Sequence, residues 1–199
     1  MKVRDSGMPE ESFWATFFEP ENILAAFGID KETEDVVEFG CGYGTFTLAA
    51  ARLISGIVFA LDIEPEMIGT VTEKCEREGI FNVLAEQRDF VEEGTGLPDC
   101  FADAVLLFNI LHHEAPVALL REAFRVLRPG GTAAVIHWNH DPTTPRGPTL
   151  EIRPHPEECI AWGIEAGFAF FPHERFDLKP YHYGLTLRKP LDEPTKETR

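Results

Sequence analysis

A short segment near the start of the chain carries three glycines at alternate positions. It reads Glu38-Phe39-Gly40-Cys41-Gly42-Tyr43-Gly44 and follows the apolar residues Val36 and Val37. Glycine tolerates positive φ angles and has no Cβ, so a ligand can lie directly against the backbone of such a turn. A glycine-rich turn between a strand and a helix is typical of sites for adenosine-containing cofactors. The segment therefore predicts a cofactor site and leaves open which cofactor it serves.

Nicotinamide dinucleotides, flavins and S-adenosylmethionine all use turns of this kind, and neighbouring residues help to separate them. Asp62 ends the next apolar run, where a carboxylate can accept hydrogen bonds from both ribose hydroxyls or can cap the following helix. The dinucleotide fingerprint G-x-G-x-x-G requires its third glycine at position 45, where this chain has Thr45. Glu38 places negative charge where a pyrophosphate would bind, and it suits a ligand with ammonium and sulfonium groups.

Residues 36–131 resemble the class I S-adenosylmethionine-dependent methyltransferases, in particular the small-molecule type 11 group related to the ubiquinone and menaquinone biosynthesis enzymes. Five segments carry the resemblance in order: Glu38 to Gly44, Asp62-Ile63, Asp89-Phe90, Phe101 to His113, and Leu127-Arg128-Pro129-Gly130-Gly131. The resemblance implies that S-adenosylmethionine is the cofactor. It also implies that the residues holding the cofactor are Glu38, Gly40, Cys41, Gly42, Asp62, Ile63, Asp89, Phe90 and Asn109.

Two histidines are the candidate catalytic residues. Methyl transfer from a sulfonium is an in-line displacement that needs positioning and exclusion of water, and a general base only where the nucleophile holds a proton tightly. His112 and His137 follow the fourth and fifth expected strands, and each can equally be structural. His113 is expected to pack and hydrogen-bond locally, as the family's histidine there commonly does. His137 and His140 fall on opposite faces of an extended chain, so no metal site is expected.

The elements that position these residues follow from apolar periodicity. Strands are expected at 36–39, 57–61, 83–86, 104–108 and 132–137, and helices at 21–28, 45–54, 64–78, 116–127 and 157–166. Thr45 is expected to cap the helix at 45–54. The alternation predicts an α/β fold with right-handed crossovers and a parallel sheet. The runs 168–176 and 181–188 are expected to pair antiparallel.

The family resemblance makes this architecture more specific. It implies a Rossmann-like seven-stranded sheet with helices on both faces, the strand order 3-2-1-4-5-7-6 and an antiparallel last strand. Residues 21–189 are then expected to form the methyltransferase domain. An aromatic segment at 1–20 and a polar tail at 190–199 would flank it.

Two segments outside the alternation of strands and helices are candidates for the part of the site that binds the methyl acceptor. Aromatic residues at positions 13, 14, 17 and 18 form a helical stripe, which either docks on the fold or forms a lid over the methionine end of the cofactor. The proline-rich segment 139–156 is expected to be a loop that shapes the substrate site. Its Arg146 or Arg153 either pairs with a substrate carboxylate or phosphate or stays solvated.

The composition of the chain limits the kinds of partner that the protein is expected to bind. Acidic residues outnumber basic ones 34 to 18, giving a formal net charge of −16, which disfavours nucleic acid and anionic membranes. Four dispersed cysteines without a C-x-x-C motif indicate neither zinc nor disulfides and fit a cytoplasmic setting. No apolar run is long enough for a signal peptide or a spanning helix. A small-molecule acceptor and a monomer or homodimer are expected.

Two alternative functions remain open from the sequence. A nicotinamide-dependent oxidoreductase is disfavoured by the glycine spacing and by the lack of room for a catalytic domain. A catalytically silent subunit that binds S-adenosylmethionine would keep the same motifs, because they predict cofactor binding and not turnover.

Overall fold

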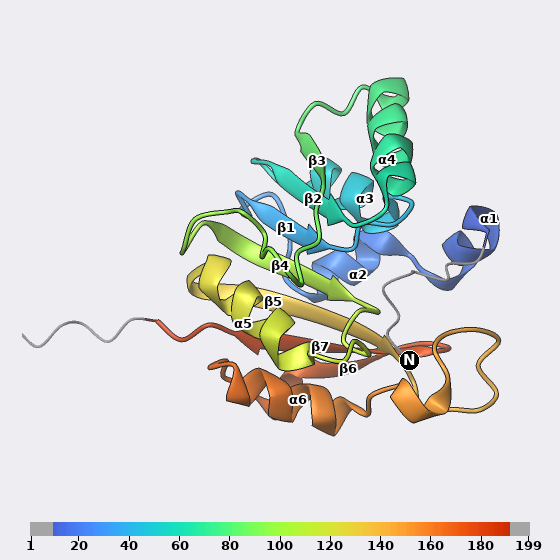
Figure 1. The fold of residues 1–199 in the computed structure, drawn as a ribbon, viewed down its shortest axis with the longest axis vertical. Helices are drawn as coiled ribbons and strands as arrows, with labels where there is room; N and C mark the ends of the chain where they lie inside the picture. The colour runs from blue at the N-terminus through green and yellow to red at the C-terminus, as the bar shows by residue number, and fades with distance from the viewer. Residues whose placement is uncertain (1–9, 192–199) are drawn as a thin grey trace, which may run out of the picture.

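The computed structural model describes residues 10–191, and Figure 1 shows them as a central sheet between two layers of helices. The strands are β1 (Val36–Phe39), β2 (Val58–Asp62), β3 (Val83–Gln87), β4 (Ala102–Phe108), β5 (Leu127–Trp138), β6 (Arg175–Leu178) and β7 (His182–Arg188). The helices are α1 (Glu11–Trp14), α2 (Pro20–Ala26), α3 (Thr45–Leu53), α4 (Pro65–Glu78), α5 (Pro116–Val126) and α6 (Pro156–Glu165).

The sheet has the order β3-β2-β1-β4-β5-β7-β6, which confirms the predicted topology. The first five strands pair in parallel, and β7 pairs antiparallel with both β5 and β6. The order reverses between β1 and β4, which is the point where ligands bind in open α/β sheets.

Two apolar layers enclose the sheet. Helices α5 and α6 pack on one face, where Leu119, Leu120 and Cys159 are buried against β4, β5 and β7. Helices α2, α3 and α4 pack on the other face, through residues such as Leu24 and Phe46. The apolar runs at 104–108 in β4 and 133–136 in β5 follow from this burial on both sides.

Three local predictions were wrong. Helix α3 is capped by Gly44 in a left-handed conformation, and Thr45 makes no side-chain cap. Strand β5 begins at Leu127, so the segment 128–131 forms an irregularity inside the strand and does not precede it. The run 168–176 forms a strand only from Arg175, although Ala169 makes an isolated bridge with β7.

Parts of the flanking predictions lie outside the described residues. These are positions 1–9 of the N-terminal segment and positions 192–199 of the polar tail. Within residues 10–191, no helix is both long and apolar enough to cross a membrane.

Candidate cofactor and active site

The predicted cofactor residues meet at one edge of the sheet. Glu38 to Gly42 follow β1, Asp62 and Ile63 follow β2, Asp89 and Phe90 follow β3, and Asn109 follows β4. These strands are neighbours in the sheet, so their carboxyl ends lie side by side. In Figure 1, β4 points toward this edge, which α1 and the loop after β5 flank.

The backbone of the glycine turn is bonded to β2. The amides of Gly40 and Cys41 donate to the carbonyl oxygen of Leu61 at 2.8 and 3.0 Å. The amide of Gly42 donates to Oδ2 of Asp62 at 2.9 Å. Dinucleotide-binding turns use such amides to hold pyrophosphate. Here they are engaged within the protein, which disfavours a dinucleotide.

Asp62 combines two local roles. Its Oδ2 accepts from Gly42, and its Oδ1 accepts from the amide of Glu64 at 3.0 Å, where α4 begins. Burial raises the pKa of Asp62, and these backbone hydrogen bonds oppose the rise. A carboxylate oxygen has a second lone pair, so Asp62 can still accept from a ribose hydroxyl. The prediction that Asp62 caps α4 was wrong, because the N-cap is Glu64 and no side chain caps the helix. The ribose-binding interpretation stays a prediction.

Glu38 is a buried carboxyl group without a cation. Its side chain is 3% exposed, and Oγ1 of Thr47 donates to it at 2.5 Å. Burial raises the pKa of Glu38 to about 8, Thr47 opposes the rise, and the charge of Asp62 adds to it. No ion pair with Glu38 is present within residues 10–191. Thr47 was not predicted as a site residue, although the first turn of α3 faces the end of β1.

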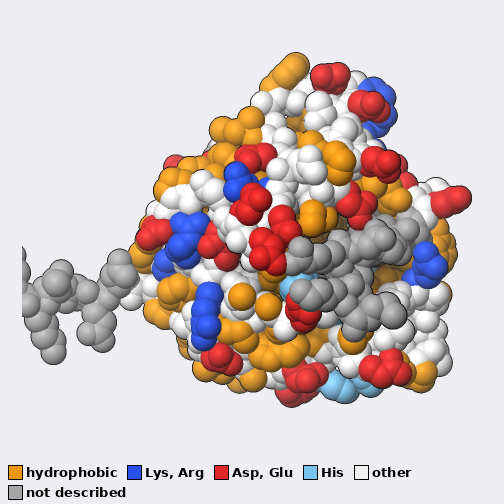
Figure 2. All heavy atoms as spheres, viewed as in Figure 1, with side chains coloured by type: hydrophobic (Ala, Val, Ile, Leu, Met, Phe, Trp, Pro, Cys, Tyr) orange, Lys and Arg blue, Asp and Glu red, His pale blue; other side chains and the backbone are white. Residues whose placement is uncertain are grey.

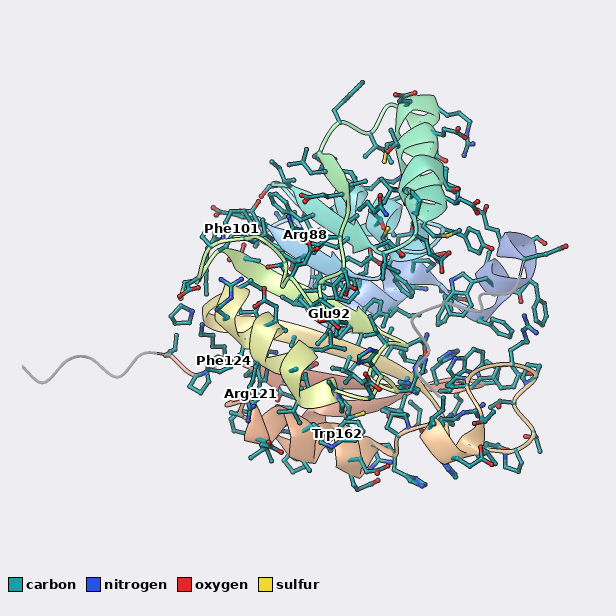
Figure 3. The ribbon with its side chains drawn as sticks, viewed as in Figure 1. Arg88, Glu92, Phe101, Arg121, Phe124 and Trp162 are labelled. Atoms are coloured by element: carbon teal, nitrogen blue, oxygen red, sulfur yellow. The ribbon has the colours of Figure 1, made fainter. Side chains whose placement is uncertain are left out.

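Asp89 and Phe90 shape the turn after β3. Oδ1 of Asp89 accepts from the amides of Val91 and Glu92, each at 3.2 Å. Phe90 is buried and its ring lies 5.1 Å from that of Phe39. Figure 3 shows Glu92 on the loop that passes in front of the sheet toward β4. Asp89 and Phe90 therefore form a hydrogen-bonded turn that packs against β1.

Buried polar side-chain atoms without a hydrogen-bond partner gather at the same edge. Within the described residues they are Nδ2 and Oδ1 of Asn109, Nε2 of His113, Nδ1 of His137 and Nε2 of His182. Asn109 also has a φ of 56°, unusual for a residue with a side chain. Each unpaired buried group costs about 1–3 kcal/mol. A ligand that bonded the atoms of Asn109 and His113, the two partly exposed residues of this set, would recover part of that cost, so these two residues fit a polar cofactor.

The two candidate catalytic histidines are in contact. Nδ1 of His112 lies 3.2 Å from Nε2 of His137. Burial lowers the pKa of His112 to about 4 and that of His137 well below its usual value. His137 has no exposed surface, whereas His112 is partly exposed. Of the two residues, only His112 therefore reaches the surface of the protein.

His113 makes the local contact that was predicted. The amide of Ala115 donates to Nδ1 of His113 at 3.1 Å. In a neutral imidazole that accepts at Nδ1, the hydrogen is on Nε2. That nitrogen is buried without a partner among the described residues, so His113 also offers a donor at this edge.

Arg153 has a different role from the two predicted for it. It is 6% exposed, and its guanidinium donates to Asn139 O at 2.9 Å, Thr144 Oγ1 at 2.6 Å and Pro148 O at 2.8 Å. Its guanidinium is neither exposed to solvent nor free to pair with a substrate anion. It holds the segment 139–153 together, while the side chain of Arg146 is exposed.

Replacing Arg153 by methionine is expected to loosen this loop, because its carbonyl groups lose their common donor. Limited proteolysis followed by mass spectrometry should detect several-fold faster cleavage within 139–152. Arg146→Met is the matched control, and its cleavage rate should equal that of the wild type. Equal rates for all three proteins would contradict the role of Arg153.

The aromatic N-terminal segment docks at the same edge. The ring of Phe17 lies 5.3 Å from that of Trp138 at the end of β5, and the ring of Phe18 lies 4.7 Å from that of His182. Phe18 also contacts Phe46 of α3, at 5.2 Å. The stripe therefore joins β5 and β7 to the helix that follows the glycine turn.

Lys74 links this segment to the glycine turn. Its Nζ lies 2.5 Å from Oε1 of Glu11 in α1 and 2.5 Å from the carbonyl oxygen of Tyr43. Lys74 was not predicted as a site residue, because an isolated lysine on a helix has no distinguishing sequence pattern. Figure 2 shows acidic side chains scattered among apolar and basic ones over the face of the molecule in view.

Comparison with known proteins agrees with this geometry. Residues 36–131 match the family model described as "Methyltransferase domain". This stretch is a class I S-adenosylmethionine-dependent methyltransferase domain. Its bounds coincide with the segment that carried the resemblance, and S-adenosylmethionine is the cofactor of the family.

This chain matches its curated relatives over only part of their length. Sterol 24-C-methyltransferase of Neurospora crassa is 31% identical over 133 residues, covering 65% of this chain and 34% of the relative. Ribosomal protein L11 methyltransferase of Dechloromonas aromatica is 32% identical over 106 residues, covering 53% of this chain and 32% of the relative. The chain thus spans about a third of these relatives, whose names indicate different acceptors.

A solved structure matches nearly the whole length of this chain. The methyltransferase from Aquifex aeolicus superposes with a TM-score of 0.79 at 24% identity, covering 90% of this chain and 94% of that one. At this identity the likeness shows the shared fold.

Proposed function

We propose that the protein is an S-adenosylmethionine-dependent methyltransferase that methylates an oxygen, nitrogen or carbon atom of a small molecule. The observation that carries the proposal is the pair of side chains, Asn109 and His113, which follow β4 in a methyltransferase domain and have buried polar atoms without a partner among the described residues. The rings of Trp14, Phe17 and Trp138, which pack together beside this edge, favour a small acceptor over a protein.

In this proposal the chain's own residues recognise the charge of the cofactor. Bound S-adenosylmethionine would supply a methyl group on a sulfonium, with the carbon–sulfur electron pair remaining on sulfur. The carboxyl group of Glu38 would ionise beside a positively charged group of the ligand. Asp62 would accept from the ribose, and Asn109 would offer both a donor and an acceptor.

His112 would receive the acceptor's proton where the nucleophile is a hydroxyl or an amine. Its pKa of about 4 means that the imidazole is neutral, and therefore able to accept, at pH 7. The depressed pKa also makes it a weak base, which suits a nucleophile that already loses its proton readily.

Saturating S-adenosylmethionine or S-adenosylhomocysteine is expected to raise the melting temperature, and NAD is not. A ligand at 100 times its Kd stabilises the folded state by about 2.7 kcal/mol, which corresponds to several degrees in a thermal-shift assay. Asp62→Ala should lose most of the shift, whereas Glu66→Ala, an exposed carboxylate in the first turn of α4, should keep it.

Stabilisation by NAD alone would contradict the proposal. Stabilisation by S-adenosylmethionine without methyl transfer to any acceptor would favour a catalytically silent subunit. A full thermal shift in Asp62→Ala would mean that this residue only orders the glycine turn and α4.

We further propose that the N-terminal segment acts as a lid over the bound cofactor. The contacts of Phe17, Phe18 and Lys74 support this arrangement, because they join the segment to both sides of the edge. Deleting residues 1–18 is expected to weaken binding of S-adenosylhomocysteine several-fold in calorimetry. Unchanged affinity in a folded deletion variant would indicate docking without a lid function.

A further inference from the structure

The segment between β3 and β4 carries two of the predicted cofactor residues but has no helix or strand of its own. It covers residues 88–101 and passes in front of the sheet, with Asp89 and Phe90 near its start (Figure 3). The amides of Glu92 and Glu93 donate to the carbonyl oxygen of Asp89 at 3.2 and 2.9 Å, which closes one turn. A single turn has few internal hydrogen bonds, so its conformation depends on the groups to which it is attached.

One carboxylate on α5 ties this segment down. Oε1 of Glu122 accepts from the amide and from the hydroxyl of Thr95, both at 2.7 Å. Thr95 is 1% exposed, and its hydroxyl also accepts from the amide of Leu97 at 3.3 Å. Gly94, with a φ of +66°, lies so close that an added Cβ would be 3.0 Å from Oε1 of Glu122. Glu122 therefore contacts the segment directly after the turn at 89–93.

Glu122 is itself held in place by Arg125. The guanidinium of Arg125 donates to both carboxylate oxygens, at 2.7 and 2.8 Å, and to Oδ1 of Asp99 at 2.6 Å. The hydrogen bonds from Arg125 lower the pKa of Glu122 to about 2, so the carboxylate is ionised at pH 7. Hydrogen bonds to an ionised acceptor are roughly twice as strong as those between neutral groups. Helix α5 is anchored in turn by the buried residues Leu120 and Val126.

Packing alone does not fix the far end of the turn. Phe90 is buried beside Phe39, but the residues that follow it border a cleft. Val91 and Gly94 line one side of this cleft, and Ala118 of α5 lines the other. The hydrogen bonds at Thr95 therefore close the end of the turn that the core does not hold.

We propose that Glu122 is a positioning residue that, through Thr95, fixes the turn at 89–93 in the conformation that binds the cofactor. Glu122 acts through the segment and does not contact the ligand. Without its carboxylate the segment opens, and the affinity for the cofactor falls by the fraction of molecules that stay closed. The inference rests on the proposed function in so far as this turn binds S-adenosylmethionine.

Hydrogen exchange in the ligand-free full chain tests whether the carboxylate fixes the turn. In Glu122→Ala, the amides of Glu92 and Glu93 should exchange roughly tenfold faster or more, because the turn loses its attachment. Neither amide bonds to Glu122, so faster exchange there reports opening of the turn and not the loss of one hydrogen bond. The amides of β4 and β5 should keep their wild-type rates, which a general loss of stability would not allow.

Calorimetry with S-adenosylhomocysteine tests the effect on binding. Glu122→Ala should weaken binding roughly tenfold. Glu122→Gln keeps an acceptor oxygen for Thr95 and should recover most of the affinity, and Thr95→Val, which keeps only the amide, should lose part of it. Glu165→Gln is the matched control, because this exposed carboxylate pairs with Arg121 of the same helix at 3.2 Å. It should match the wild type in both measurements.

Wild-type exchange of Glu92 and Glu93 in Glu122→Ala would overturn the proposal, and so would faster exchange with unchanged affinity. Equal losses in Glu122→Gln and Glu122→Ala would overturn it as well, because the bond to Thr95 would then be irrelevant. If Glu122→Ala does not fold, Thr95→Val gives the same two readings. The exchange measurement needs no ligand, so it stands even if the wild type fails to bind S-adenosylmethionine, the result that would refute the proposed function.

Discussion

Replacing Gly44 by alanine is expected to destabilise the protein by about 3 kcal/mol and to abolish most cofactor binding. Gly44 has a φ of +79°, and an added Cβ would lie 2.7 Å from Leu48 Cδ1 and 3.0 Å from Val71 Cγ2. The left-handed conformation costs a non-glycine residue about 1–2 kcal/mol, and overpacking costs about 1–3 kcal/mol more. Chemical denaturation and calorimetry with S-adenosylhomocysteine measure the two effects.

Gly69→Ala provides the matched control for this substitution. Gly69 lies inside α4, and a Cβ added there would meet no atom within 4 Å. Alanine is favoured over glycine in a helix by about 1 kcal/mol, so this variant should be as stable as the wild type or more stable. Wild-type stability of Gly44→Ala would mean that α3 and α4 adjust freely around the turn.

The second large effect expected is a change in the pH dependence of stability on replacing Glu38 by glutamine. The pKa of Glu38 is about 8 in the folded protein, against 4.5 for the ordinary side chain. The folded state therefore binds more protons than the unfolded state between these values, and the free energy of unfolding falls as pH rises through this window.

At about 1.4 kcal/mol per pKa unit, the loss from Glu38 amounts to roughly 3–5 kcal/mol between pH 4.5 and 8. Glu38→Gln should remove most of it, and urea denaturation at several pH values measures the difference. Asp62, whose pKa is also raised, accounts for a residual slope of the same sign. Glu21→Gln, at an exposed position in α2, should retain the wild-type slope.

The same carboxyl group links cofactor binding to proton release. A cationic ligand favours the ionised form of Glu38, so binding near pH 7 should release a proton in the wild type and none in Glu38→Gln. Calorimetry in buffers of different ionisation enthalpy reports this number. Equal proton release in both proteins would contradict the raised pKa of Glu38. So would an equal dependence of the free energy of unfolding on pH.

Much of the fold could be predicted from the sequence, because the decisive signals are local. Apolar runs and helix stops predicted most strands and helices to within a few residues. The exceptions are the start of β5 and the run 168–176, of which only the end belongs to β6. The errors fell where backbone conformation decided the outcome: left-handed Gly44 caps α3 in place of Thr45, and the segment 128–131 is accommodated inside β5. Strand order came from the family motifs, since periodicity alone does not determine which strands are neighbours.

The sequence by itself determined the cofactor class, since the residues expected to hold it lie in short motifs at the ends of strands. Only the tertiary structure decided how the residues around those motifs act. It placed Thr47 on Glu38, directed Arg153 into its own loop, and buried His137 beside His112. The physical reason is that burial and hydrogen-bond partners depend on neighbouring strands and helices, which are distant in sequence. The sequence alone does not distinguish a histidine that faces a substrate from one that supports another side chain.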